Sequence, residues 1–355
     1  MSSAFDRDVW GIFGMPIDNV SLDEAASLIE QAVETRTRLS FVTPNVNWMV
    51  RALKNDHAMR QIVNADLSLA DGAPVVWLAR QLGMPLAERV AGSDLFDRLR
   101  EDASETAKPI RVFFFGGRDG AAEAAHNTLK EEQGRLKAAG WHNPGFGDVE
   151  SMSSGEIRDK INAAKPDFII VSLGAAKGQD WIEHNQSELE APVIAHLGAV
   201  VDFVAGTIKR APNWATRIGL EWVWRIIAEP SLWKRYWNDG KDIVGIVSGD
   251  LGRLKKASRP KQGVRGVEAA FNGSALTLSG DLVIDTRNEI RENLSVAAQK
   301  PSDCQLDLTA VRTIDASALG QLRMLEQSLM RRGNRLEILP STEIEPALQA
   351  ARMTL

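Results

Sequence analysis

Polar side chains that could bind a substrate or move a proton follow two short apolar runs early in the chain. The run at residues 39–43 ends in Thr43 and is followed by Asn45 and Asn47, and the run at residues 68–70 is followed by Asp71 and Gly72. A carboxylate at a strand end can act as a general base or hold a sugar hydroxyl. A nearby hydroxyl and two amides can bind hydroxyls or phosphate oxygens. Helix caps and an Asp-Gly turn need the same residue types, so spacing alone leaves both interpretations open.

Two further apolar runs end in glycine. Residues 111–115 lead into Gly116 and Gly117, and residues 168–173 lead into Gly174, with Lys177 and Gln179 shortly after. Glycine at a strand end before a helix lets a phosphate approach the helix N-terminus closely. Lys177 suits either a phosphate or a solvated helix start. Neither segment carries the GxGxxG fingerprint or the GK[ST] of a P-loop, which argues against an NAD-dependent oxidoreductase, a kinase or an ATPase.

These residues need a scaffold that brings strand ends to one edge. Residues 1–205 alternate short apolar runs with helical stretches, at 22–35, 120–139 and 154–164 among others. This alternation predicts an α/β core: a Rossmann-like, mainly parallel sheet flanked by helices. Ligands of such sheets bind at the carboxyl ends of the strands, where all the residues above fall. The sequence therefore predicts one site at that edge.

A basic, Trp-rich helical appendage is expected at residues 206–253, followed by a polar linker at 254–266. These residues hold thirteen Lys/Arg, five Asp/Glu and five of the ten tryptophans, in a chain whose net charge is −5. Cationic, Trp-rich helices favour contact with anionic lipid. Arg217, Glu221 and Arg225 have the spacing of one helix face. This spacing fits either a surface ion pair or arginines directed at a diphosphate.

The last segment, residues 267–355, predicts a small α/β unit with a core of its own. Strand-like runs flank Asn272-Gly273, which is a strong hairpin signal. A helix is expected at 285–298, a strand at 305–308, a helix at 317–331 and a strand at 335–339.

Composition excludes several classes of protein. The chain of 355 residues has a single cysteine, Cys304, so cysteine zinc clusters and intramolecular disulfides are excluded, and the five histidines show no metal-ligand spacing. Its acidic balance argues against a protein that coats nucleic acid. Neither a signal peptide nor an apolar run long enough to span a membrane is apparent. We expect a cytoplasmic protein attached at most to the inner surface of the cell membrane.

The ordered set of motifs resembles the WecG/TagA/CpsF family, glycosyltransferase family 26, over roughly residues 8–245. The resemblance rests on motifs spread from the first strand ends to the basic appendage: Thr43-Pro-Asn45-Val-Asn47, Ala70-Asp71-Gly72, Arg89-Val-Ala-Gly92-Ser93-Asp94, Phe115-Gly116-Gly117, Gly198-Ala-Val-Val-Asp202-Phe203, Ala205-Gly206, Lys209-Arg210-Ala211-Pro212, Gly219-Leu220-Glu221-Trp222 and Glu229-Pro230 with Arg235-Tyr236.

The resemblance implies an inverting transfer of a sugar from a UDP-sugar to a polyprenyl-diphosphate-linked saccharide in bacterial surface polysaccharide synthesis. The sugar would be N-acetylmannosamine-type, its uronic acid, or glucose. Asp71 matches the family's proposed base, and Thr43 and Asn45 match its polar partners. Further residues are expected to bind the substrate: Asn45, Asn47, Gly72, Arg89, Gly116, Gly117, Gly174, Lys177, Gln179, Asp202 and Arg210. Arg217, Arg225, Arg235 and Trp222 are expected to meet the lipid diphosphate and the membrane. No cofactor or metal is required.

One motif departs from the family. The family has a Gly-x-Pro-Lys-Gln-Glu motif where this chain has Gly174-Ala-Ala-Lys177-Gly178-Gln179, so Gly178 stands where the family has glutamine. The departure weakens the assignment of Gln179. It also supports an alternative function, a non-catalytic scaffold that recruits partners.

The last ninety or so residues resemble a STAS domain through Leu278-Ser-Gly280-Asp281-Leu282, Leu306-Asp307-Leu308 and Ile314-Asp315-Ala316-Ser317. Phosphorylated STAS domains carry a serine directly after the aspartate, where this chain has Ala316. The resemblance therefore implies a protein-docking module rather than a phosphorylation switch.

Overall fold

A six-stranded parallel sheet forms the first half of the molecule, as predicted. The computed structural model describes residues 4–86, 88–101, 108–208, 211–212, 221–228, 230, 233–260 and 263–353. The strand order is β4-β3-β8-β7-β5-β6, with all neighbours parallel. The strands are β3 (Leu39–Val42), β4 (Leu67–Ser68), β5 (Ile110–Gly116), β6 (Leu136–His142), β7 (Phe168–Ser172) and β8 (Val193–His196).

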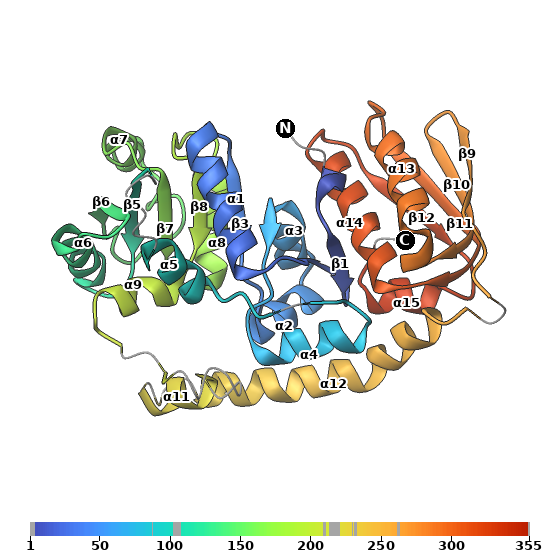
Figure 1. Ribbon diagram of the computed structural model, residues 1–355, viewed down its shortest axis with the longest axis horizontal. Coiled ribbons are helices and arrows are strands. Elements are labelled where there is room, and N and C mark those ends of the chain that lie inside the picture. The colour runs from blue at the N-terminus through green and yellow to red at the C-terminus, as the bar shows by residue number, and fades with distance from the viewer. Residues whose placement is uncertain are drawn as a thin grey trace.

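Helices cover both faces of this sheet (Figure 1). One face packs on α1 (Leu22–Thr35), α5 (Gly92–Glu101), α6 (Ala121–Glu131) and α9 (Gly198–Val204). The other face packs on α7 (Gly155–Ala163) and α8 (Ala175–Asn185). Alternate residues of β5 serve the two sides, since Phe114 packs with the first group and Phe115 with the second. Burial on both faces explains why these strands are continuous apolar runs.

The prediction of a helix at residues 120–139 is wrong for the second half of that segment. Helix α6 ends at Glu131, and Leu136–His142 forms β6, which pairs with β5 along the edge of the sheet. The Lys and Ala residues of this segment favour a helix by intrinsic propensity, but hydrogen bonds to β5 determine the outcome. Only the tertiary structure supplies that partner.

The C-terminal unit is a second α/β layer with strand order β12-β11-β10-β9. Its strands are β9 (Glu268–Asn272), β10 (Ala275–Leu282), β11 (Cys304–Ile314) and β12 (Leu336–Pro340); its helices are α13 (Arg287–Ala298), α14 (Ala316–Met330) and α15 (Glu345–Ala350). Strands β9 and β10 are antiparallel around Asn272-Gly273, which confirms the predicted hairpin.

An N-terminal hairpin, β1 (Val9–Ile12) and β2 (Met15–Asp18), docks on α14 and joins the two halves (Figure 1). The backbones approach so closely that a Cβ on Gly320 would lie 2.2 Å from the carbonyl oxygen of Val9. The buried guanidinium of Arg323 donates to the carbonyl oxygens of Gly14 (2.7 Å) and Ala351 (3.0 Å). Contrary to the expectation of a separate core, one apolar cluster contains the hairpin, helices near it and the C-terminal unit.

The appendage spans the length of the molecule. Helix α11 (Glu221–Ala228) precedes the long α12 (Trp233–Ala257), which runs beneath α2 (Val46–Lys54) and α4 (Ala73–Gln81) to α15 (Figure 1). The first residues of the expected linker, 254–257, belong to this helix. At its far end Asp250 accepts a hydrogen bond from Arg352 at 3.3 Å. Within the described ranges, every helix is too short or too polar to cross a membrane.

Candidate active site

Asp71 lies at the carboxyl edge of the parallel sheet, three residues after the end of β4. The backbone N–H of Asp71 donates to the carbonyl oxygen of Pro44 (3.0 Å), and that of Val90 donates to the carbonyl oxygen of Ala70 (2.9 Å). These two bonds hold the loops that carry Thr43, Asp71 and Arg89 beside one another. Asp71 is half-buried. The sequence motifs therefore do converge at one strand edge.

Gly72 is the residue at which α4 begins. Its φ of +93° is a conformation that glycine adopts without strain, and the chain bends there before the helix begins. The helix has no side-chain cap at this residue.

The asparagines of the 43–47 segment have structural partners. The side chain of Asn45 caps α2, accepting from the backbone N–H of Asn47 (3.1 Å) and Trp48 (3.3 Å). The amide of Asn47 donates to the carboxylate of Asp239 on α12, at 3.1 and 3.3 Å. Capping is therefore confirmed for Asn45. Asn47 joins the strand edge to the appendage, and Asp239 is a residue that sequence reasoning missed, because its partner lies 192 positions away.

Thr43 and Arg89 flank the same edge. Thr43 is half-buried, and its methyl group lies where a Cβ on Gly92 would come within 3.4 Å. Arg89 forms an ion pair with Asp94 on α5. That ion pair fixes the guanidinium against the first turn of α5.

Gly116 and Gly117 allow β5 to end against β7. A Cβ on Gly116 would lie 2.6 Å from the carbonyl oxygen of Ser172, and the N–H of Gly117 donates to that same oxygen at 2.6 Å. Both glycines have positive φ. Their residue type is thus explained by close packing, and phosphate binding at this turn stays a prediction.

Gly174 has a more open environment. It is the cap residue before α8 and has a φ of +79°; apart from its chain neighbours, no atom of the described residues lies within 4 Å of where its side chain would be. Lys177, one turn on, donates to the carbonyl oxygen of Gly147 at 2.6 Å and so anchors a loop. Gln179 is buried, and its Oε1 has no hydrogen-bond partner within the part of the chain that the structure describes. Of these three residues, Gly174 is best placed to admit a ligand.

Gly178 and His196 explain the departure from the family motif. A Cβ on Gly178 would lie only 2.2 Å from Cδ2 of His196, at the end of β8. Burial, and then the charge of Arg51, lower the pKa of His196 from 6.5 to about 4, so the ring is neutral at physiological pH. The glutamine of the family therefore has no room unless His196 moves.

Several predicted residues lie in or near the appendage. Asp202 is on α9, shortly before the appendage. It is buried, and its Oδ2 lies 3.9 Å from Nε of Arg118. Arg210 and Arg217 lie outside the described residues. Trp222 and Arg225 are on α11 and Arg235 is on α12, but their side chains are outside the described set.

One group of side chains among the described residues could hold a cation. Ligand atoms of His57, Asp180 and Glu183 lie within 4.8 Å of one another, on α3 (Asp56–Asn64) and α8. Nε2 of His57 is 2.9 Å from Oδ1 of Asp180, the geometry of a surface ion pair. No spacing signal could have revealed this group, because α3 and α8 meet only in the folded chain. It is not on the loop that carries Asp71.

Comparison with known proteins gives two family matches. The model of the "Glycosyl transferase WecG/TagA/CpsF family" matches residues 10–256, and that of the "Mlab, STAS domain" matches residues 266–351. The second match identifies the C-terminal unit as a STAS domain.

Two curated relatives have the same name, "N-acetylglucosaminyldiphosphoundecaprenol N-acetyl-beta-D-mannosaminyltransferase". The one from Bacillus spizizenii is 31% identical over 216 residues, 60% of this chain and 80% of the relative. The one from Staphylococcus aureus is 28% identical over 226 residues, 63% of this chain and 85% of the relative. A solved structure, "crystal structure of SsGBP and GDP complex", matches with a TM-score of only 0.21 at 9% identity over 68% of this chain and 96% of that one, too low to inform the fold.

Proposed function

The chain belongs to the WecG/TagA/CpsF family of glycosyl transferases, and we propose that it transfers N-acetylmannosamine from its UDP derivative to a polyprenyl-diphosphate-linked saccharide. The names of the relatives favour this sugar over the uronic acid and glucose options. The observation that carries the proposal is the convergence of Asp71, Thr43 and Arg89 at one strand edge.

Asp71 is proposed as the general base. An inverting transfer is a direct displacement, in which the acceptor oxygen attacks the anomeric carbon while the UDP oxygen leaves. The carboxylate of Asp71 takes the proton of the acceptor hydroxyl as that bond forms. Its place on a loop held by Pro44 and Val90 supports this role, since hydrogen-bonded backbone on both sides limits its movement. Thr43 is proposed to orient the acceptor hydroxyl.

The negative charge that develops on UDP needs a fixed positive environment. The N-terminus of α8 at Gly174 offers backbone N–H groups and open space, which supports placing the diphosphate there. We propose that helix N–H groups and arginines carry this charge and that neither a metal nor a cofactor takes part. Transfer should then proceed unchanged in excess EDTA.

Attachment to the membrane surface is proposed for the appendage. On α12 Trp233 is 52% exposed and Trp237 is 60% exposed. Nζ of Lys234 lies 6.0 Å from the ring centroid of Trp233, and Nζ of Lys241 lies 5.4 Å from that of Trp237. Exposed Trp and Lys on one helix favour the interface of an anionic bilayer. This supports a reaction at the inner surface of the cell membrane, where the lipid-linked acceptor lies.

The test is release of UDP by the purified full-length chain. The donors are UDP-N-acetylmannosamine, its uronic acid and UDP-glucose, each with and without polyprenyl-diphosphate-linked N-acetylglucosamine. We expect release only with the first donor and only with acceptor. A protein that binds UDP but releases none with any pair would contradict the proposal and favour the non-catalytic scaffold that recruits partners through the STAS domain.

A further inference from the structure

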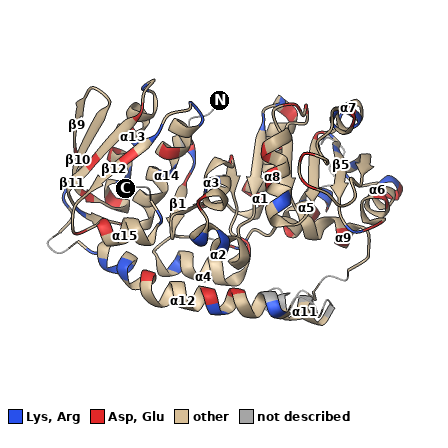
Figure 2. Cartoon of the chain, turned by 180° about the vertical axis from the view of Figure 1, so that it is seen from behind, with Lys and Arg blue, Asp and Glu red and all other residues tan. Residues whose placement is uncertain are grey.

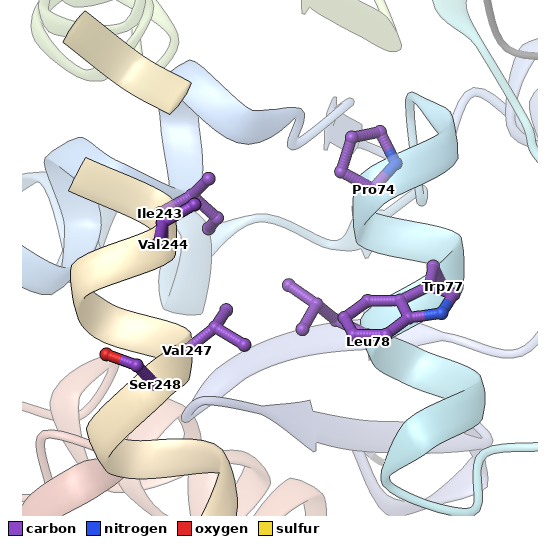
Figure 3. A pocket seen from close by; sticks show the side chains of 7 residues that line it. All are labelled: Pro74, Trp77, Leu78, Ile243, Val244, Val247 and Ser248. Carbon is purple, nitrogen blue, oxygen red and sulfur yellow. The ribbon is translucent and has the colours of Figure 1, made fainter. Parts of the chain in front are cut away.

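An apolar groove lies between α4 and α12. Helix α12 is fixed beyond both ends of this groove. At one end Asn47 of α2 donates to Asp239, and at the other Gln81, the last residue of α4, accepts from Nζ of Lys255 at 2.6 Å. Between these points the helices leave a cavity of about 330 Å³. Figure 3 shows Leu78 of α4 and Val247 of α12 directed toward each other across it.

The lining is apolar and open to solvent. It comprises Pro74, Trp77 and Leu78 from α4 and Ile243, Val244 and Val247 from α12, with Ser248 at the edge. Trp77 is 52% exposed and Val244 67% exposed, although a closely packed helix pair would cover both. A site with this lining offers polar ligands few hydrogen-bond partners, and it favours a hydrocarbon because binding buries apolar surface.

The position of the groove relates it to the candidate active site. Pro74 is three residues after Asp71, in the first turn of α4, so the groove begins beside the proposed base. At the same end, exposed Trp237 and Lys241 lie on the preceding turns of α12. Figure 2 shows the charged residues of α12 spaced between uncharged stretches. A substrate with a charged group near Asp71 and an apolar tail would fit this order.

We propose that the groove binds the isoprenoid units next to the diphosphate of the lipid-linked acceptor. The proposal rests on the proposed function and extends it with a second binding site for the same substrate. A cavity of about 330 Å³ is at the small end of ligand pockets, which hold about 300–1,000 Å³. The groove therefore takes only the first units of a polyprenyl chain, and the remainder stays in the bilayer beside the exposed tryptophans of α12.

The test compares two soluble probes, farnesyl diphosphate and inorganic pyrophosphate, with no membrane present. Calorimetric titration of the wild type should give a Kd for farnesyl diphosphate at least about tenfold lower, since burial of a few methylene groups accounts for such a factor. Ser248→Phe fills the groove from an exposed position, and Val244→Gln makes its rim polar. Both should remove the preference and leave the Kd for pyrophosphate unchanged. Val296→Gln, an exposed valine on α13, is the matched control and should keep the preference.

Equal affinity of the wild type for the two probes, or binding of neither, would overturn the groove proposal. So would a preference that persists in Ser248→Phe. Loss of binding to anionic phospholipid vesicles in the groove variants, without any change in farnesyl diphosphate affinity, would instead identify the surface as a membrane contact. Release of UDP is measured separately. If the wild type prefers farnesyl diphosphate but transfers no sugar, the groove proposal stands and the proposed function is contradicted.

Discussion

The same sequence pattern, a strand followed by Asp, a small residue and a helix, occurs in both halves of the molecule with different outcomes. After β4, Gly72 rather than Asp71 is the cap residue of α4, and Asp71 stays half-exposed at an open strand edge. After β11, Asp315 caps α14 and accepts from Ala318 N (3.0 Å), Ile284 N (2.7 Å) and the hydroxyl of Ser317 (2.6 Å).

The helix that follows reinforces this difference. Helix α4 presents an exposed Trp77 beside an open groove, whereas α14 is buried along nearly its whole length against the N-terminal hairpin. The hydroxyl of Ser317 is covered as well. Asp315 is covered and positions a helix through its hydrogen bonds, whereas Asp71 is half-exposed at the strand edge, where a substrate can reach it. Burial distinguishes the two regions; residue type does not.

The largest expected effect separates the two aspartates by activity. Asp71→Asn should lower sugar transfer about 10²- to 10⁴-fold, the usual contribution of a general base, with an unchanged melting temperature. Asp315→Asn should leave transfer within a factor of a few, because Asp315 meets no substrate. Initial rates of UDP release and thermal melts of both variants check this. Activity retained in Asp71→Asn would remove Asp71 as the base.

A second prediction concerns the contact that buries α14. Arg323→Met should lower the free energy of unfolding by about 3–5 kcal/mol, because Glu326 and three backbone carbonyls lose a buried cationic partner. Arg331→Met on the same helix is the control, since its exposed ion pair with Asp66 accounts for less than about 1 kcal/mol. Denaturant titration measures both. Equal effects of the two substitutions would contradict a structural role for the α14 interface.

The smallest effect is a pH dependence. Burial raises the pKa of Asp315 against the opposing effect of its hydrogen bonds. The resulting stability is fully present below the unfolded pKa of about 3.9 and is lost as pH rises through the folded pKa, by about 1.4 kcal/mol for each unit of difference. Asp315→Asn should therefore gain stability relative to the wild type as pH rises from about 4.

The control for this measurement is Asp307→Asn. Hydrogen bonds from Thr309 lower the pKa of Asp307, so its contribution is present at neutral pH and is lost on acidification. This variant should lose stability relative to the wild type as pH rises, the opposite direction. Melting temperatures between pH 3.5 and 7 distinguish the trends, and parallel curves for Asp315→Asn and the wild type would contradict the assignment.

Much of the architecture was accessible from the sequence because its signals are local. Strands buried on both faces of a parallel sheet are apolar throughout, so the end of each apolar run marks the end of a strand and the residues of the loop that follows. The strand ends at Thr43, Asp71, Gly116 and Gly174 could therefore be located, and Asn272-Gly273 specified its hairpin.

Tertiary structure alone decided what depends on distant partners. Residues 136–142 became a strand because β5 offered an unpaired edge, and Gly178 is required because His196 lies against it. The contact of Asn47 with Asp239, the docking of α14 on the N-terminal hairpin and the groove between α4 and α12 all join segments far apart in the chain. Sequence determined the types of residue available at each strand edge. Their function depends on which surfaces stay open, because packing between distant segments buries some polar groups and leaves others accessible to a substrate.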